Sequence, residues 1–156
     1  MSPSVATLVL QAISAFSIAL FSAWVTVKLS QKRFRAERLW DRKIIAYERV
    51  IEAFHKSKKF SSEHMDAEHV GGVLSEERDK ELRRLAHEAM EEICRTRDIG
   101  SFTLSDEAMK ILAAYEHKSS DNDHISMWEE HLAHDFKVTG KYMNQFIAEA
   151  RRDLGK

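Results

Sequence analysis

Residues 5–29 read VATLVLQAISAFSIALFSAWVTVKL, and this segment says more about the architecture than any other part of the chain. Its first 23 residues carry no charged side chain. A helix of that length crosses a hydrocarbon layer roughly 30 Å thick, at about 1.5 Å rise per residue. A secretory signal peptide has a basic segment before its apolar core, whereas here the preceding residues are MSPS. We therefore expect a retained transmembrane anchor in residues 1–29, followed by a helical domain in residues 30–156.

The charges that follow the apolar segment predict its orientation. Residues 28–59 hold 11 Lys or Arg side chains against four acidic ones, whereas the rest of the chain after them is net acidic. Positive charge is retained on the cytoplasmic side of a membrane. We expect the N-terminus outside the cell and the C-terminal domain in the cytoplasm. The side chains expected to contact lipid headgroups are Lys28, Lys32, Arg33, Arg35 and Arg38. A nucleic-acid patch is a weaker reading of the same charges, and a nucleic-acid partner is not expected.

Polar and small side chains recur along the predicted span at spacings of three and four residues. Such spacing places them on one helix face, where small residues permit close helix contact and Gln or Ser can form hydrogen bonds between helices. We therefore predict a homo-oligomer, with a water-filled lumen as an open alternative. The other reading is an ordinary anchor whose hydroxyls bond their own helix. The predicted association face consists of Thr7, Gln11, Ser14, Ala15, Ala19, Ser22 and Thr26.

The remainder of the sequence predicts an all-α fold with about four helices. One proline and five glycines leave few breaks, and apolar residues recur at helical spacing. The first helix is expected to continue from the anchor, with SSEHMDAEHVGG (61–72) as a linker. Ser75 and Ser105 are predicted N-caps, with a helix end near Gly100 and SFTL (101–104) as an extended connector. SSDND (119–123) separates the last two helices, and Asp123 is the expected cap of the final one.

Two pairs of histidines are candidate metal ligands, and the weaker pair, His64 and His69, lies in the predicted linker at a spacing that does not align on a helix. His131 and His134 are three residues apart on a predicted helix, with Glu130 and Asp135 beside them. A zinc or di-iron site needs further ligands, and a second Glu-x-x-His motif is absent from the sequence. The single cysteine excludes an intramolecular disulfide. We therefore expect no metal and no cofactor.

A third pattern resembles the HEPN ribonucleases, helical dimers with an Arg followed by a His four to six residues later. Arg49 and His55 have this spacing, but about two such pairs are expected by chance, and Val50 replaces the usual polar residue. The resemblance implies RNA cleavage by two such pairs across a dimer cleft. Motifs for serine or cysteine nucleophiles and for phosphate loops are missing from the sequence, so an enzyme is not the expectation.

Two further segments resemble a scattered group of small bacterial proteins with one N-terminal span and a helical cytoplasmic part. They are Leu39-Trp40-x-x-Lys43-x-x-Ala46-Tyr47-x-x-Val50-Ile51-Glu52-Ala53 and Asp98-Ile99-Gly100-Ser101-Phe102-x-Leu104-Ser105-Asp106-Glu107-Ala108. The layout is also similar to membrane-anchored accessory proteins of CRISPR and other anti-phage systems. The resemblance implies a bacterial inner-membrane protein and transfers no activity.

From these observations we expect a non-enzymatic, self-associating single-pass protein that couples a cytoplasmic bundle to the membrane. An anti-phage or stress effector would use such coupling to perturb the bilayer, in response to a cytoplasmic protein partner. The alternatives are a membrane-tethered HEPN-like ribonuclease and a passive anchor for a partner protein.

Overall fold

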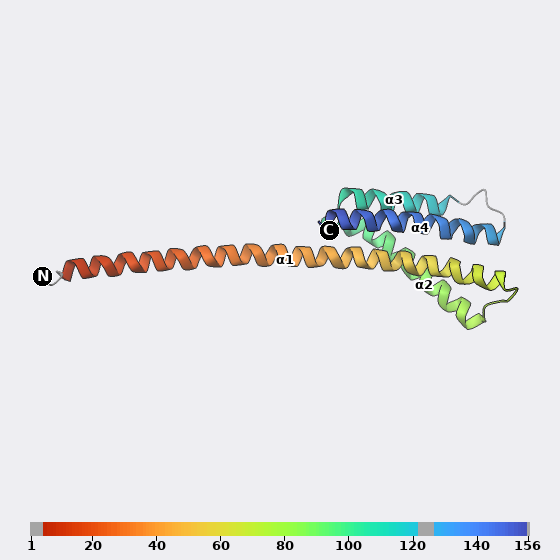
Figure 1. Ribbon diagram of the computed structural model, residues 1–156, viewed down its shortest axis with the longest axis horizontal. Coiled ribbons are helices and arrows are strands. Elements are labelled where there is room, and N and C mark those ends of the chain that lie inside the picture. Colours follow the sequence, from red (N-terminus) through yellow and green to blue (C-terminus); the bar gives the residue numbers. More distant parts are fainter. Residues whose placement is uncertain (1–4, 122–126, 156) are drawn as a thin grey trace. The chain divides into compact units, whose positions relative to one another are not determined.

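A computed structural model describes residues 5–121 and 127–155, with side chains described from residue 16 onward. These residues form four α-helices and no strand: α1 (Val5–His69), α2 (Glu76–Ile99), α3 (Asp106–Ser120) and α4 (Trp128–Asp153) (Figure 1). A short 3-10 helix, η1 (Gly100–Phe102), separates α2 from α3. The predicted all-α class with about four helices is confirmed.

The chain divides into two compact units, residues 1–41 and residues 42–156. This division does not test the predicted membrane boundary after residue 29, which stays a prediction. Over the side chains that the structure describes, no helix contains a stretch long and apolar enough to cross a membrane. The side chains of residues 5–15, which begin the predicted span, lie outside that description.

Both predicted serine caps are confirmed. The Ser75 side chain accepts a hydrogen bond from the Arg78 backbone N–H (3.3 Å), and the Ser105 side chain accepts one from the Ala108 N–H (3.1 Å). Each bond satisfies one of the backbone donors that a helix start leaves without an intrahelical partner. The predicted end of α2 at Gly100 is also confirmed.

The predicted linker at residues 61–72 was wrong over most of its length, because α1 continues to His69. Tertiary contacts hold this end of α1 against α2. Ser61 and His64 are buried, and Arg78 of α2 donates two hydrogen bonds to the Glu63 carboxylate (2.5 and 2.8 Å). The chain leaves the helix at Gly71, whose φ of +64° is the left-handed conformation that glycine adopts without strain.

Two smaller expectations also needed correction. Residues 101–104 are not extended, because the backbone N–H groups of Thr103 and Leu104 both bond the Gly100 carbonyl (2.8 Å each) and form a tight turn. The last helix begins at Trp128, with Met127 in the N-cap position and no side-chain cap bond. Asp123, the predicted cap, lies outside the described residues.

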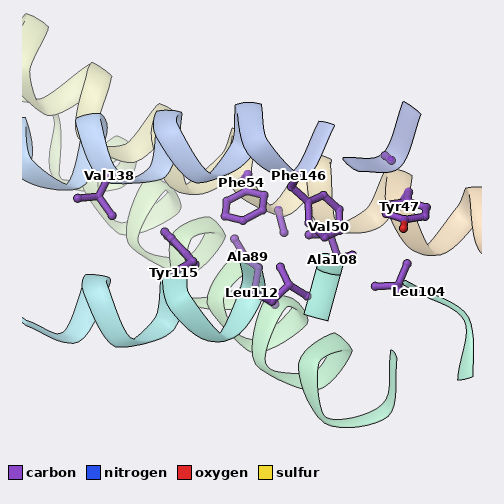
Figure 2. Packing of buried hydrophobic residues seen from close by; sticks show 13 residues of the cluster. Tyr47, Val50, Phe54, Ala89, Leu104, Ala108, Leu112, Tyr115, Val138 and Phe146 are labelled. Atoms are coloured by element: carbon purple, nitrogen blue, oxygen red, sulfur yellow. The ribbon is translucent and has the colours of Figure 1, made fainter. Parts of the chain in front are cut away.

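The core of residues 42–156 lies between α1, α2, α3 and α4 (Figure 2). Phe54 of α1 is at its centre, with ring centroids 4.9 Å from Tyr115 of α3 and 5.9 Å from Phe146 of α4. Helices α3 and α4 lie side by side and run in opposite directions (Figure 1).

Candidate functional site

The predicted association face is described only in part. The side chains of Thr7, Gln11, Ser14 and Ala15 lie outside the described residues. Ala19, Ser22 and Thr26 are exposed on α1. The Thr26 hydroxyl donates to the Ser22 carbonyl (2.8 Å), so its proton is used within its own helix. Contacts between helices through Thr26 would therefore rely on its methyl group or on the hydroxyl oxygen as an acceptor.

Large apolar side chains are exposed all along the described part of residues 1–41. Phe16 and Phe21 are each 67% exposed, and Trp24 is 58% exposed. Burying one such side chain is worth about 1.5–3 kcal/mol relative to leaving it in water. A run of this kind is therefore expected to be covered by lipid or protein. The run consists of Phe16, Ile18, Leu20, Phe21, Trp24, Val25, Val27, Leu29, Phe34, Leu39 and Trp40.

The five predicted headgroup contacts are all exposed cations. Lys28 Nζ lies 5.9 Å from the centre of the Trp24 ring, and the Arg38 guanidinium lies 4.5 Å from the centre of the Phe34 ring. Among the described residues, none of Lys28, Lys32, Arg33, Arg35 and Arg38 forms an ion pair. Their charge is thus available to an external anion.

Arg49 and His55 do not share a cleft. Arg49 lines clefts formed with α2, whereas His55 lines a cleft with Phe136 and Met143 of α4. Six residues along a helix turn the chain by about 600°, which separates the two side chains by roughly 120° around α1. The arrangement within one chain thus does not bring the two residues of the HEPN-like pattern to a common substrate position.

The paired histidines of α4 lie beside a partly buried acid. Burial raises the pKa of Asp135 above its usual range, and the nearby His131 and His134 act in the opposite direction. His134 Nε2 is buried and has no hydrogen-bond partner among the described residues. Within that part of the chain, no group of three or more His, Cys, Asp or Glu side chains is arranged to hold a metal ion.

His64 occupies a more structured setting than its place in the predicted linker implied. Its Nδ1 lies 2.8 Å from the Phe60 carbonyl and its Nε2 lies 2.8 Å from the Asp79 carboxylate. Both partners are acceptors, so whichever ring nitrogen carries a proton can donate to one of them. Hydrogen bonds from Arg83 and from His64 lower the pKa of Asp79. Trp128 packs edge-on against the His64 ring, and the group borders an open cleft of about 460 Å³.

A polar network connects Lys43 and Tyr47 of α1 with Asp153 of α4. The Tyr47 hydroxyl donates to Asp153 (2.6 Å), which also accepts from Lys43 (2.7 Å). The Ser105 hydroxyl donates to the buried Glu149 carboxylate (2.6 Å). Burial opposes the ionisation of Asp153, but the bonds from Lys43 and Tyr47 outweigh it and hold its pKa below the usual range. The network connects α1, the start of α3 and the end of α4, so its geometry indicates a structural role.

The chain matches no protein-family model, no curated protein and no solved structure. The resemblances noted in the sequence therefore remain expectations.

Proposed function

We propose that this chain is a non-enzymatic, single-pass membrane protein that self-associates and couples its helical domain to the membrane. The observation that carries the proposal is the succession of two segments. Residues 5–27 carry no charge, and seven Lys or Arg side chains follow within the next 16 residues. The first segment suits a hydrocarbon layer, and the second suits the anionic cytoplasmic surface.

The exposed side chains of residues 16–41 support this proposal. A row of aromatic and aliphatic groups, including Phe16 and Phe21, has no cover within the described chain. Lys28 lies one helical turn after Trp24, with its ammonium group near the Trp24 ring. An indole near a lysine is favourable at the boundary between hydrocarbon and headgroups. A lipid bilayer would cover the apolar groups and leave the cations at its surface.

Self-association through the polar face of the span is the second part of the proposal. Gln11 is the most polar residue of residues 5–27, and an amide in hydrocarbon needs a hydrogen-bond partner that an isolated helix does not provide. The amide of a second copy supplies one. Small side chains on the same face, such as Ala15 and Ala19, would allow that copy to approach closely.

A cytoplasmic partner that biases the assembled spans would make the protein an effector, as in an anti-phage or stress response. A passive anchor shares the same membrane segment but does not require a defined oligomer. The ribonuclease alternative gains no support from the positions of Arg49 and His55, which line different clefts.

Alkaline carbonate extraction of bacterial membranes tests the anchor. We expect the full chain to stay in the membrane pellet, and its release into the supernatant would refute the proposed anchoring.

Native mass spectrometry of the full chain in nanodiscs tests the association face. We expect a defined oligomer for the wild type and dissociation for Gln11→Leu. Ser17→Leu is the matched control, because helical spacing places Ser17 off that face. A monomeric wild type would favour the passive anchor, and equal dissociation of both variants would reject Gln11 as the specific contact.

A further inference from the structure

A cleft of about 360 Å³ lies between α1 and the end of α2, and its charged lining is basic apart from one glutamate. Arg42 and Arg49 of α1 border it on one side, and Arg95 of α2 borders it on the other. Residues seven apart lie on the same face of a helix, about 10 Å from one another along its axis. The two α1 guanidinium groups therefore flank a single groove.

The guanidinium groups of Arg42 and Arg49 have no ion pair among the described residues. Most other arginines of residues 42–156 are paired with an acid, such as Arg78 with Glu63 and Arg84 with Glu88, and Arg151 is the exception. An arginine carries five N–H donors in a planar fork that matches the oxygens of phosphate. Two forks that border one groove and lack an internal acceptor are suited to an external anion.

Arg95 adds a third cation, which is only partly used. Its Nε and Nη2 donate to the Glu92 carboxylate at 2.9–3.3 Å, which leaves Nη1 for another acceptor. Glu92 is the one acidic residue that borders this cleft. The lining thus keeps a net charge of about +2 from three arginines and one glutamate.

The neighbouring cleft along the same pair of helices has a more acidic lining. It is smaller, about 280 Å³, and shares Arg49 and Glu92 with the first. Its lining also includes Glu52, Glu88 and Lys56, and Lys56 is paired with Glu52 (2.8 Å). An anion is therefore favoured at the Arg42 end of the groove and disfavoured at the other end.

The cleft between the arginines also has an apolar surface. Ile45 of α1 is 47% exposed and Ile99 of α2 is 57% exposed, and both line it. Exposed isoleucines between cations would be covered by a ligand that joins an anionic group to an apolar one.

We propose that this cleft binds a phosphate ester, with the phosphate held by Arg42 and Arg49 and the apolar part of the ligand against Ile45 and Ile99. The same chemistry is offered by the headgroup region of an anionic phospholipid and by a soluble nucleotide. The inference does not depend on membrane anchoring, because every lining residue belongs to residues 42–156.

Calorimetric titration of the full chain in a nonionic detergent tests the site with three probes. These are dioctanoyl phosphatidylglycerol, dioctanoyl phosphatidylcholine as its zwitterionic counterpart, and adenosine monophosphate. The test variant is Arg42→Gln/Arg49→Gln. The matched control is Lys137→Gln/Arg151→Gln, which removes the same charge from two exposed α4 side chains without a described ion pair. All four substituted side chains are exposed, so far-UV circular dichroism should report unchanged helix content.

We expect saturable binding of one anionic probe per chain, at least tenfold weaker in the test variant and within threefold of wild type in the control. Binding of phosphatidylglycerol alone would identify a lipid headgroup as the source, and binding of the nucleotide would identify a soluble ligand. Equal weakening in both variants would overturn the site in favour of diffuse attraction. Absence of saturable binding by either anionic probe would overturn it as well, as would equal binding of the zwitterionic lipid.

Discussion

Tyr47 belongs both to the hydrophobic core and to a polar network. Its ring is buried beside Phe146, and its hydroxyl donates to the Asp153 carboxylate. Burial and then the bond to Asp153 raise its pKa to about 12. Apolar spacing in the sequence places Tyr47 on the inner face of a helix, but Asp153 is 106 residues away and no local pattern pairs the two.

The raised pKa of Tyr47 predicts a loss of stability at alkaline pH. A tyrosine in the unfolded chain loses its proton near pH 10, before Tyr47 does in the native state, so deprotonation stabilises the unfolded state first. The stabilisation of the native state by protonated Tyr47 is fully present below about pH 10 and is lost as the pH rises toward about 12. A rise of this size corresponds to about 3 kcal/mol in the free energy of unfolding, of which about 2 kcal/mol is lost between pH 8 and pH 11.5. Urea unfolding of wild type and Tyr47→Phe at pH 8 and pH 11.5 measures it.

We expect Tyr47→Phe to be less stable than wild type at pH 8, because the Asp153 carboxylate loses a donor, and to lose less stability between the two pH values. Tyr142→Phe is the control and should keep the full alkaline loss. An equal loss of stability between pH 8 and pH 11.5 in wild type and Tyr47→Phe would contradict the assignment of the alkaline loss to Tyr47.

At the scale of elements, the first turns of α2 and α3 could be predicted from the sequence, whereas the C-terminal end of α1 could not. Ser75 and Ser105 cap their helices through contacts three residues away, so the local sequence contains the whole signal. The polar segment after Phe60 lacks such a signal. It is helical because His64 and Glu63 bond to α2, which lies 15 residues further along the chain.

Substitution of alanine for glycine is expected to have opposite effects on stability at Gly100 and at Gly140. A Cβ at Gly100 would lie 3.2 Å from both Thr96 Cγ2 and Met109 Sδ, and Thr96 is buried with a stiff β-branched side chain. Gly100→Ala should therefore destabilise the chain by about 1–2 kcal/mol through overpacking. At Gly140, inside α4, the nearest atoms belong to Lys58 at 3.8 Å. Gly140→Ala should stabilise the chain by about 0.5–1 kcal/mol, because alanine has the higher helix propensity.

Thermal and urea unfolding of both variants beside wild type provides the measurement. A neutral or stabilising Gly100→Ala would show that Met109 and Leu104 move away at little cost, which would contradict a tightly packed turn.

At the scale of the whole molecule, the described side chains of the hydrophobic core all belong to residues 42–156. Its buried members begin at Tyr47 and end at Ala150, and none comes from the described side chains of residues 16–41. The described apolar side chains of residues 16–41 are instead exposed. The free energy of folding is therefore expected to arise almost entirely within the second unit.

A truncated chain tests this division. Residues 42–156 alone should unfold cooperatively, with a melting temperature within about 5 °C of the corresponding transition of the full chain, equivalent to about 1 kcal/mol. Residues 56–156 serve as the control. They lack Tyr47, Val50 and Phe54, whose loss should abolish the cooperative transition. Circular dichroism during heating measures both, and a non-cooperative 42–156 fragment would contradict the independence of the core.

Helical class and the two serine caps could be predicted because each depends on residues close together in the sequence. The extension of α1 and the Tyr47–Asp153 bond required the folded chain. Their partners lie on other helices, and helix packing rather than local spacing brings them together. The cleft between Arg42, Arg49 and Arg95 belongs to this second group. A row of arginines is visible in a sequence, but whether an acid neutralises each one depends on the neighbouring helix.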